Sequence, residues 1–575
     1  MKGKKVWLLM LVFALVMVLA ACNGGSTDNA ATDETPVDGE DEGGDEEATT
    51  APPENNVVTM AIDTNFGGIF EPAFYSNAVD ADVIEFMHDS LFAYDENIQF
   101  QPYIASWETE DELTYTFTLE DGITWHNGDP LIAADWAYAL ETIAHPDYSG
   151  VRYSNVSHIV GADAKQSGEA ETISGIEVVD DLTLKVTFKE KLVNNLLNLW
   201  DAPMPSKYYE GIPVAELPDS PKVRQEPIGF GPFKVKEVRE GEYIEFEKFE
   251  DYWQGAPKLD GVIVRTYDPS VTQGAFENGE IDIMGIRAAD AKAFSGIDHL
   301  TTTEVQGLSY SYVGFKLGHF DEELGRAVMD RPKFEDLELR TAMYHAINRP
   351  ALLEAFLDNG GSVTNSVVPA THWIAAEPDQ LTQYDYNPEK AMQILDDAGY
   401  VDVDGDGLRE NPEGQPLQIN FDHYDGPANF EGRAMALIQS WQDIGLNVEL
   451  NGSLKEVNLY YELVENDDEQ IDVYFGGWSV GADPDPSGIW RSDVAFNYPR
   501  WYSEESDALL AEALKTFDEE ERKEIYVEWQ QLVNEELPLL PLWTNNDYYA
   551  QNNRLQGVTY DWSGAFDDAH LWSVQ

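Results

Sequence analysis

An acidic stretch between residues 402 and 413 has the residue types and the spacing of a calcium-binding loop. Carboxylates stand at positions 1, 3 and 5 of these twelve residues, Gly407 stands at position 6, and acidic residues return at positions 9 and 12. Hard oxygen ligands at alternating positions wrap one ion, and the glycine permits the sharp turn. The predicted ligands are Asp402, Asp404, Asp406, Leu408 through its backbone carbonyl, Glu410 and Glu413. The alternative is an acidic turn without an ion in a chain rich in aspartate.

The flanks of this loop differ from those of an EF-hand. The segment before it has helical character, but Pro412 and Pro416 disfavour a helix after it. The sequence therefore predicts a structural Ca²⁺ that braces a loop, and no calcium sensor. No cofactor is expected to be required, and the ten histidines are scattered without metal-ligand spacing.

A second segment, Gly477–Gly481, has the spacing of the nucleophile elbow of hydrolases, with Ser479 at its centre. Such an elbow needs a strand before the serine and a helix directly after it. Residues 471–475 could supply the strand, but Pro484 and Pro486 oppose an immediate helix. The sequence therefore predicts no enzyme, and an exported esterase that uses Ser479 is kept only as a remote alternative.

The elements that must position these segments alternate between strands and helices. Period-two patterns predict strands, and three- to four-residue periodicity predicts helices. Asn387 and Pro388 are typical of a helix start, and Gly399 is typical of its end. The predicted strands are 113–119, 182–188 and 243–249; the predicted helices are 135–143, 334–347, 388–398, 429–441 and 506–537. The chain is therefore expected to have an α/β fold.

The amino terminus has the layout of an export signal that ends at the single cysteine. Three lysines precede a 16-residue apolar run, and small residues lead to Cys22. A membrane span needs roughly 20 apolar residues, so the run is short for one. This layout resembles the lipobox of bacterial lipoproteins, in which the cysteine is lipidated. Residues 1–21 are interpreted as a lipoprotein signal peptide, with an ordinary secretory signal as the alternative. The expected location is the extracytoplasmic face of the cell membrane.

The charge of the chain excludes several classes of partner. The formal net charge is −72, and removal of residues 1–21 leaves 32 basic against 107 acidic residues. Residues 22–56 hold only acidic charges and few large apolar side chains, which predicts a disordered tether. The remaining body is acidic as well. A field of this sign repels nucleic acid and anionic lipid head groups.

Six motifs along the body resemble one known family. The most specific is LEDGITWHNGDPLIAADW, which spans Leu119–Trp136. The others, in chain order, are Gly229–Phe233, Phe276–Asp282, Leu339–Arg349, Ala398–Tyr400, and Gly477-Trp478 followed by Asp485-Pro486. Together they are similar to the extracytoplasmic solute-binding proteins of family 5, the oligopeptide, dipeptide and nickel class that serves ABC importers. The resemblance runs from about residue 57 to the carboxyl terminus.

The resemblance implies a periplasmic-binding-protein-like fold of type II, cluster C: two hinged lobes with an extra inserted domain. Ligand would be enclosed between domains I and III as they close on each other. The expected boundaries are 57–88, 209–305 and 539–575 for domain I, 89–208 for the inserted domain II, and 306–538 for domain III.

The resemblance also implies which residues touch a ligand. In peptide binders of the family, an aspartate shortly after the Gly-Trp pair accepts the ligand's α-ammonium group. The spacing here departs by one residue, so Asp483 is the first choice and Asp485 the second. The further expected ligand contacts are Trp478, Trp490, Trp501, Tyr310, Tyr312 and Phe66.

The predicted function is capture of oligopeptides outside the cell and their delivery to an ABC permease with cytoplasmic ATPases. The protein is expected to be a monomer that touches the membrane only through its lipid anchor. An oligosaccharide carrier, a nickel-chelate carrier and a peptide-pheromone receptor of the same family remain as alternatives.

Overall fold

The computed structural model describes residues 56–95, 97–426, 429–566 and 568–575. Within these ranges, eleven strands form one mixed sheet, with the order β17-β16-β18-β12-β19-β11-β1-β10-β9-β8 and β15 paired to β19. Its strands are β1 (Val57–Ile62), β8 (Phe233–Arg239), β9 (Tyr243–Lys248), β10 (Gly261–Thr266), β11 (Ile283–Ile286), β12 (Leu300–Phe315), β15 (Gly361–Val363), β16 (Gln418–Asp422), β17 (Asn447–Leu450), β18 (Val473–Ser479) and β19 (Leu539–Asn552). β1 pairs in parallel with β10 and β11 inside the sheet, and β16 pairs in parallel with β17 and β18 at one end, whereas the other end, β10-β9-β8, is antiparallel.

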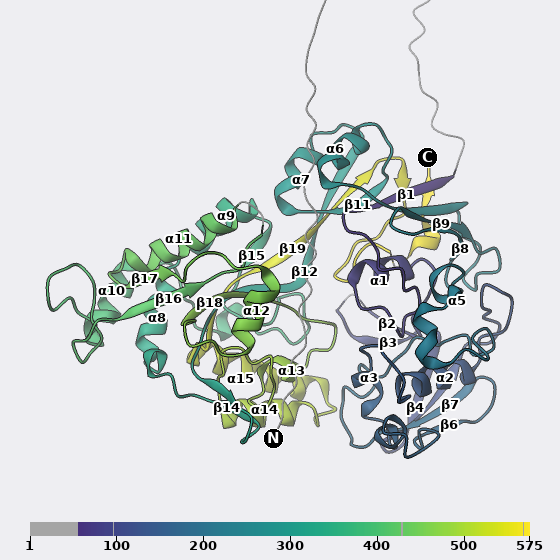
Figure 1. Cartoon of the computed structure of the whole chain (residues 1–575), viewed down its shortest axis with the longest axis horizontal. Coiled ribbons are helices and arrows are strands. Elements are labelled where there is room, and N and C mark those ends of the chain that lie inside the picture. Colours follow the sequence, from purple (N-terminus) through teal and green to yellow (C-terminus); the bar gives the residue numbers. More distant parts are fainter. Residues whose placement is uncertain (1–55, 96, 427–428, 567) are drawn as a thin grey trace, which may run out of the picture. The chain divides into compact units, whose positions relative to one another are not determined.

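Two long antiparallel strands at the middle of this sheet join its halves. β12 pairs with β18 and β19, and β19 also pairs with β11 (Figure 1). The β12–β19 register shifts between Gln306 and Ser309, so the ladder is irregular where the two halves meet. A side chain at Gly307 would come within 3.0 Å of the backbone carbonyl oxygen of Asn545 on β19, so glycine fits best at this point of the ladder.

Residues 73–230 form a separate core around a four-stranded antiparallel sheet, which we call the inserted core. Tyr115 and Phe117 alternate inward from β5, and Trp136 packs on Phe117 with ring centroids 5.0 Å apart. The strands of this sheet are β4 (Ala105–Thr109), β5 (Thr114–Leu119), β6 (Ile176–Val178) and β7 (Thr183–Thr187). The largest core extends from Tyr310 to Trp543, and we call it the carboxy-terminal core. A third core combines residues from 58–87, 233–283 and 555–572. The domain boundaries expected from the family resemblance stay a prediction.

Short strand pairs and the helices complete the described chain. The pairs are β2 (Phe92–Tyr94) with β3 (Phe100–Pro102), β13 (His319–Asp321) with β14 (Arg326–Val328), and β20 (Leu555–Gln556) with β21 (Ser573–Val574). The helices are α1 (Ala78–Ile84), α2 (Ala133–Ile143), α3 (Ser154–Ser157), α4 (Ala162–Gln166), α5 (Pro221–Arg224), α6 (Pro269–Glu277), α7 (Ala288–Phe294), α8 (Leu337–His345), α9 (Arg349–Leu357), α10 (Pro388–Asp397), α11 (Phe430–Gln442), α12 (Val457–Glu465), α13 (Ser487–Trp490), α14 (Glu504–Ala513) and α15 (Glu519–Glu536).

Most of the elements predicted from local sequence signals are present, within a few residues of the predicted bounds. The strand predicted at 182–188 is β7, and the one at 243–249 is β9. Asn387 caps α10 by accepting a hydrogen bond from the backbone N–H of Lys390, and Gly399 follows the helix at φ +89°. Side-chain caps and left-handed glycines satisfy the groups that helix ends leave open.

The single helix predicted over 506–537 is wrong, because the chain forms two helices there. α14 ends at Ala513, and α15 begins after Asp518. The Asp518 carboxylate accepts a hydrogen bond from the backbone N–H of Glu521 at 3.0 Å, which makes it the cap of a new helix. A capping aspartate inside an apolar periodic pattern therefore marks a boundary that periodicity alone does not show.

The predicted signal peptide, Cys22 and nearly all of the predicted tether lie outside the described residues. Among the residues that are described, no helix combines the length and the apolar character that crossing a membrane requires.

Candidate functional site

A cavity of about 180 Å³ lies beside the loop that connects β18 to α13. Asp483 and Asp485, from that loop, line it together with apolar side chains of the 367–374 segment and of α13. The mixture of a few carboxylates and mostly apolar walls is typical of small-molecule sites. The structure therefore brings together three of the predicted ligand contacts, Asp483, Asp485 and Trp490, at one cavity.

The inserted core supplies two amides to the Asp483 carboxylate. The side chains of Asn194 and Asn198 donate hydrogen bonds to Asp483 Oδ2 at 3.3 and 3.2 Å. The backbone N–H of Asp485 donates to Asp483 Oδ1 at 3.0 Å. Burial raises the pKa of Asp483, and these hydrogen bonds oppose the rise. Asp483 is thus a partly desolvated carboxylate that is held by neutral donors from two parts of the chain.

Asp485 lies under stronger electrostatic stress than Asp483. Burial, and then the neighbouring charge of Asp483, raises its pKa to about 7. Ser487 donates a hydrogen bond to Asp485 Oδ1 at 2.7 Å, which offsets only part of this effect. Among the described residues, no Lys, Arg or His nitrogen lies within 4.0 Å of either carboxylate. A cation that entered the cavity would therefore relieve the repulsion between the two carboxylates.

Aromatic rings occur on both sides of this loop. Trp478, on β18, is half-buried and stacks on Tyr498 with centroids 5.3 Å apart. Trp490, on α13, is buried yet lines the cavity, and it packs edge-on against Trp529. Trp501 is buried, and its indole N–H donates to Glu536 at 2.7 Å. Trp490 therefore lines the cavity and also packs in the carboxy-terminal core, whereas Trp501 lies in that core alone.

The structure does not place Tyr310, Tyr312 or Phe66 at the cavity, and Trp478 and Trp501 do not line it either. Tyr310 and Tyr312 do share one face of β12, but both rings are fully buried in the carboxy-terminal core. A side chain at Gly476 would come within 2.5 Å of the Tyr312 ring, so this glycine makes room for it across the ladder. Phe66 packs on Phe70 in the third core. These three side chains stabilise the frame in the conformation observed here.

A second, more polar cavity of about 380 Å³ shares Val368 and His372 with the first. Lys523, on α15, lines it, together with Trp373 and polar residues of the 362–383 segment. No sequence pattern marks His372, Asn194 or Asn198, because they belong to no motif and lie near the loop only in the folded chain. A further cavity, about 410 Å³, lies elsewhere, between α6, α7 and β19.

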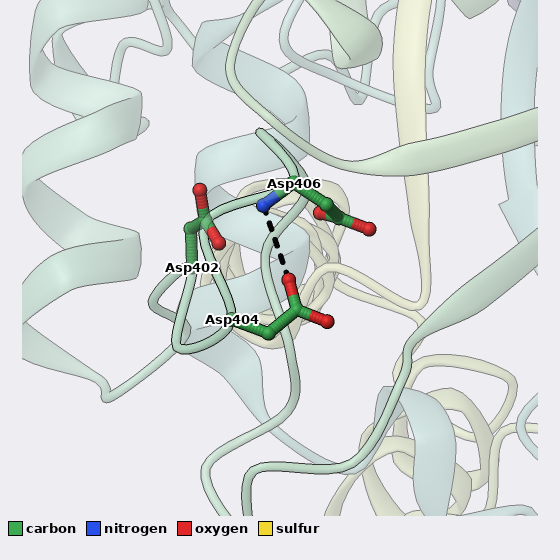
Figure 2. A group of neighbouring side chains, drawn as sticks. All are labelled: Asp402, Asp404 and Asp406. Atoms are coloured by element: carbon green, nitrogen blue, oxygen red, sulfur yellow. Dashed lines mark hydrogen bonds between the residues drawn. The ribbon is translucent and has the colours of Figure 1, made fainter.

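The predicted calcium loop folds so that three carboxylates gather. One oxygen from each of Asp402, Asp404 and Asp406 lies within 4.8 Å of the others, and all three side chains are exposed (Figure 2). The backbone N–H of Asp406 donates to Asp404 Oδ1 at 3.1 Å, the bond drawn in Figure 2.

The other predicted calcium ligands do not join this group. Glu410 is buried and accepts from the Val403 N–H at 2.8 Å, and exposed Glu413 lies outside the group. Leu408 donates its N–H to Asp406 at 2.8 Å. The donor set fits a hard cation at three of the six predicted positions.

The Gly477–Gly481 segment does not form an elbow, as expected from Pro484 and Pro486. Ser479 is the last residue of β18 and lies opposite Ser309 in the ladder, and the next helix begins at Ser487. The sharp strand-to-helix turn that would expose the hydroxyl is replaced by a loop of seven residues, 480–486.

Comparisons with known proteins agree with this fold. Residues 99–499 match the family described as bacterial extracellular solute-binding proteins, family 5. The chain is 25% identical over 569 residues to the oligopeptide-binding protein AppA of Bacillus subtilis, which covers 97% of each chain. It is 27% identical to the oligopeptide-binding protein OppA of Lactococcus lactis subsp. cremoris, over 84% of this chain and 83% of that one. The solved structure of lactococcal OppA, closed on an endogenous peptide, superposes with a TM-score of 0.70 at 25% identity and covers 89% and 98% of the two chains.

Proposed function

Because the chain belongs to the bacterial extracellular solute-binding proteins of family 5, which have two hinged lobes, we propose that it captures oligopeptides outside the cell. It would deliver them unaltered to an ABC permease. The observation that carries this proposal is the cavity lined by Asp483 and Asp485, neither of which forms an ion pair within 4.0 Å among the described residues, although Arg522 and Arg491 act on them from farther away. A peptide's α-ammonium group is a cation of the right size and hydrogen-bonding capacity to supply one.

The relatives support peptides over the other ligands that the family takes. AppA and OppA are oligopeptide-binding proteins by name, and the solved AppA complex holds a nonapeptide. One solved neighbour with the same fold is a nickel–histidine binder, so the fold alone does not choose the ligand. The carboxylate pair favours a ligand with an ammonium group. An anchor at the ligand's amino end would tolerate varied side chains while it fixes orientation.

The test is a ligand screen on the purified mature protein. Mass spectrometry of released ligands is expected to identify peptides, and free-amine peptides are expected to raise the melting temperature by ligand linkage. Cello-oligosaccharides and nickel–histidine serve as the competing classes. Stabilisation by a sugar or by nickel–histidine alone, or recovery of a cleaved peptide after incubation, would contradict the proposal.

We also propose that Cys22 carries the lipid that tethers the protein to the outer face of the cell membrane. The support is the sequence layout alone: a basic start, an apolar run and small residues before the cysteine. Metabolic labelling with a fatty-acid probe is expected to mark the expressed full-length chain and to fail for Cys22→Ser. Equal labelling of both chains would contradict the anchor.

For the loop at residues 402–406 we propose a structural Ca²⁺. The three gathered carboxylates are the support, and hard oxygen donors of this type suit Ca²⁺. Calorimetric titration of chelator-treated protein is expected to show binding that Asp404→Asn weakens. Absence of binding heat, together with an unchanged melting temperature in millimolar Ca²⁺, would contradict it.

A further inference from the structure

The inserted core contacts the carboxy-terminal core at a place where the two halves of the large sheet share no strand. The inserted core is joined to the β1 half, for example by the backbone N–H of Gly231, which donates to the Met87 carbonyl at 2.9 Å. The carboxy-terminal core includes residues of β16 and β18, which lie in the other half. A bond between these two cores therefore crosses from one half to the other without passing through β12 or β19.

Three hydrogen bonds of the described chain make this crossing next to one another. The side-chain amides of Asn194 and Asn198 both donate to Asp483 Oδ2. One residue earlier in the chain, the backbone N–H of Val193 donates to the Leu514 carbonyl at 2.9 Å. The contact therefore combines two side-chain bonds to a carboxylate with one backbone bond that fixes the position of the segment.

The segment that carries the two asparagines is held in place by its own hydrogen bonds. The backbone N–H of Asn198 donates to the Asn194 carbonyl at 2.9 Å, which closes one helical turn and places both side chains on one face. Asn195, between them, is buried, and its amide donates to the Glu190 carbonyl at 2.8 Å. Asn155 donates to the Asn198 carbonyl at 3.2 Å. Because the backbone of the turn is already ordered, the contact with Asp483 costs little further conformational entropy.

The two amides leave room on Asp483 for a ligand. A carboxylate has about four lone-pair positions for hydrogen bonds. The amides use the two positions on Oδ2, and the backbone N–H of Asp485 uses one on Oδ1. One position on Oδ1 remains for an ammonium group. The same carboxylate can therefore hold the inserted core and the amino end of a peptide together.

We propose that Asn194 and Asn198 are positioning residues that latch the inserted core onto Asp483 and so hold the two lobes closed. The latch acts with and without a bound peptide, because all of its groups belong to the protein. This inference rests on the proposed function in one respect: it assumes that the lobes move apart to take up and release a peptide.

A latch of this kind changes the rates of binding more than the affinity. A peptide enters or leaves only when the lobes are apart, so bonds that favour the closed form slow both steps. Loss of two hydrogen bonds to a carboxylate should lower the ratio of closed to open molecules by roughly 10- to 100-fold. Dissociation should accelerate by a similar factor. Association should accelerate less, because it stops rising once the ligand-free protein is fully open.

Small-angle scattering of the ligand-free protein tests the latch without any peptide. The combined variant Asn194→Ala/Asn198→Ala should have a larger radius of gyration than wild type, and Asp483→Asn, which weakens the same contact from its other side, should shift in the same direction. Asn127→Ala is the matched control, because Asn127 is an exposed asparagine of the inserted core that bonds to Asp129, and it should scatter as wild type does. A combined variant with the scattering of wild type overturns the latch. If the combined variant does not fold, Asp483→Asn decides by the same criterion.

Stopped-flow kinetics separate a latch from a general loss of structure. Trialanine, tetraalanine and pentaalanine are mixed with wild type and with the combined variant, and binding is followed by tryptophan fluorescence. The variant should release the peptide roughly 10- to 100-fold faster, and it should also bind it faster than wild type. A variant that loses affinity without faster association overturns the proposal, because damage to the fold does not speed up binding. If none of these peptides binds to wild type, the proposed function is contradicted, and the scattering comparison still decides whether the latch exists.

Discussion

Two aspartate clusters of the carboxy-terminal half differ in how their charges are satisfied. Asp402, Asp404 and Asp406 are exposed and accept hydrogen bonds from their own loop. Asp483 and Asp485 line a cavity, and burial raises the pKa of both. Similar sequence patterns of spaced aspartates therefore lead to a solvated turn in one place and to a stressed carboxylate pair in the other.

The difference shows which cluster can select a ligand by charge. A carboxylate in water is stabilised by its hydration, so the absence of a cation costs it little free energy. A desolvated carboxylate lacks that hydration, so the arrival of a cation stabilises it strongly. The amides of Asn194 and Asn198 lessen the stress on Asp483 without neutralising it. A cationic group is therefore expected to bind at Asp483 and Asp485. Substitutions at this pair should change ligand binding, whereas substitutions at the exposed cluster should not.

The largest expected effect belongs to Asp483→Asn. Loss of the carboxylate should weaken binding of a free-amine peptide by roughly 100-fold, because a charge-assisted hydrogen bond is replaced by a neutral one. The amino-acetylated peptide should change by less than about threefold. Calorimetric titration of both peptides measures the difference, and Asp404→Asn is the control that should leave both affinities unchanged. Equal losses for the two peptides would remove Asp483 as the anchor.

The raised pKa of Asp485 predicts that the stability of the folded protein depends on pH. Its pKa in the folded protein, about 7, lies above its ordinary value of 3.8. Its protonated form therefore stabilises the fold fully below about pH 4, and this stabilisation is lost as pH rises through 7. The melting temperature of the ligand-free protein should fall between pH 5 and pH 8.5, and Asp485→Asn should fall less. If the melting temperatures of wild type and Asp485→Asn changed in parallel with pH, the pKa of Asp485 would not be raised in the folded protein.

Removal of the two amides should have a moderate effect. In Asn194→Ala combined with Asn198→Ala, the pKa of Asp483 should rise further, because two hydrogen bonds that lower it are lost. Free-amine peptide affinity should fall by a few-fold, and the loss should be smaller at higher pH, because a further rise in the pKa of Asp483 favours its protonated form at low pH. Asn127→Ala is the control, since Asn127 is exposed and bonds to Asp129. A loss that does not recover at high pH would indicate a purely structural role.

The smallest effect is expected at the solvated cluster. Without divalent ions, Asp404→Asn should change the free energy of unfolding by no more than about 0.5 kcal/mol, because the side chain is exposed. Urea unfolding in the presence of a chelator measures this. A change above about 2 kcal/mol would mean that the loop carries more strain than its exposure indicates.

Local patterns predicted much of the secondary structure and the loop that carries Asp483, but they missed what only the fold determines. Residues 310–315 are buried on both faces of β12, so alternation could show that Tyr310 and Tyr312 share a face and not which face meets a ligand. Asn194 lies 289 positions from Asp483 along the chain, and nothing in its neighbours marks it. The charge pattern of the two cavities likewise depends on segments that meet only in the folded chain.

The shared central strands have a consequence for how the molecule denatures. β12 and β19 lie inside one continuous sheet, and each makes hydrogen bonds that belong to both of its halves. If either half of the sheet unfolded, β12 and β19 would lose hydrogen bonds that the other half needs. The two halves are therefore expected to unfold together. The four strands of the inserted core form a separate sheet, so no shared strand couples their unfolding to that of the large sheet. Cooperativity in this protein is therefore set by strand sharing and does not follow the division into lobes.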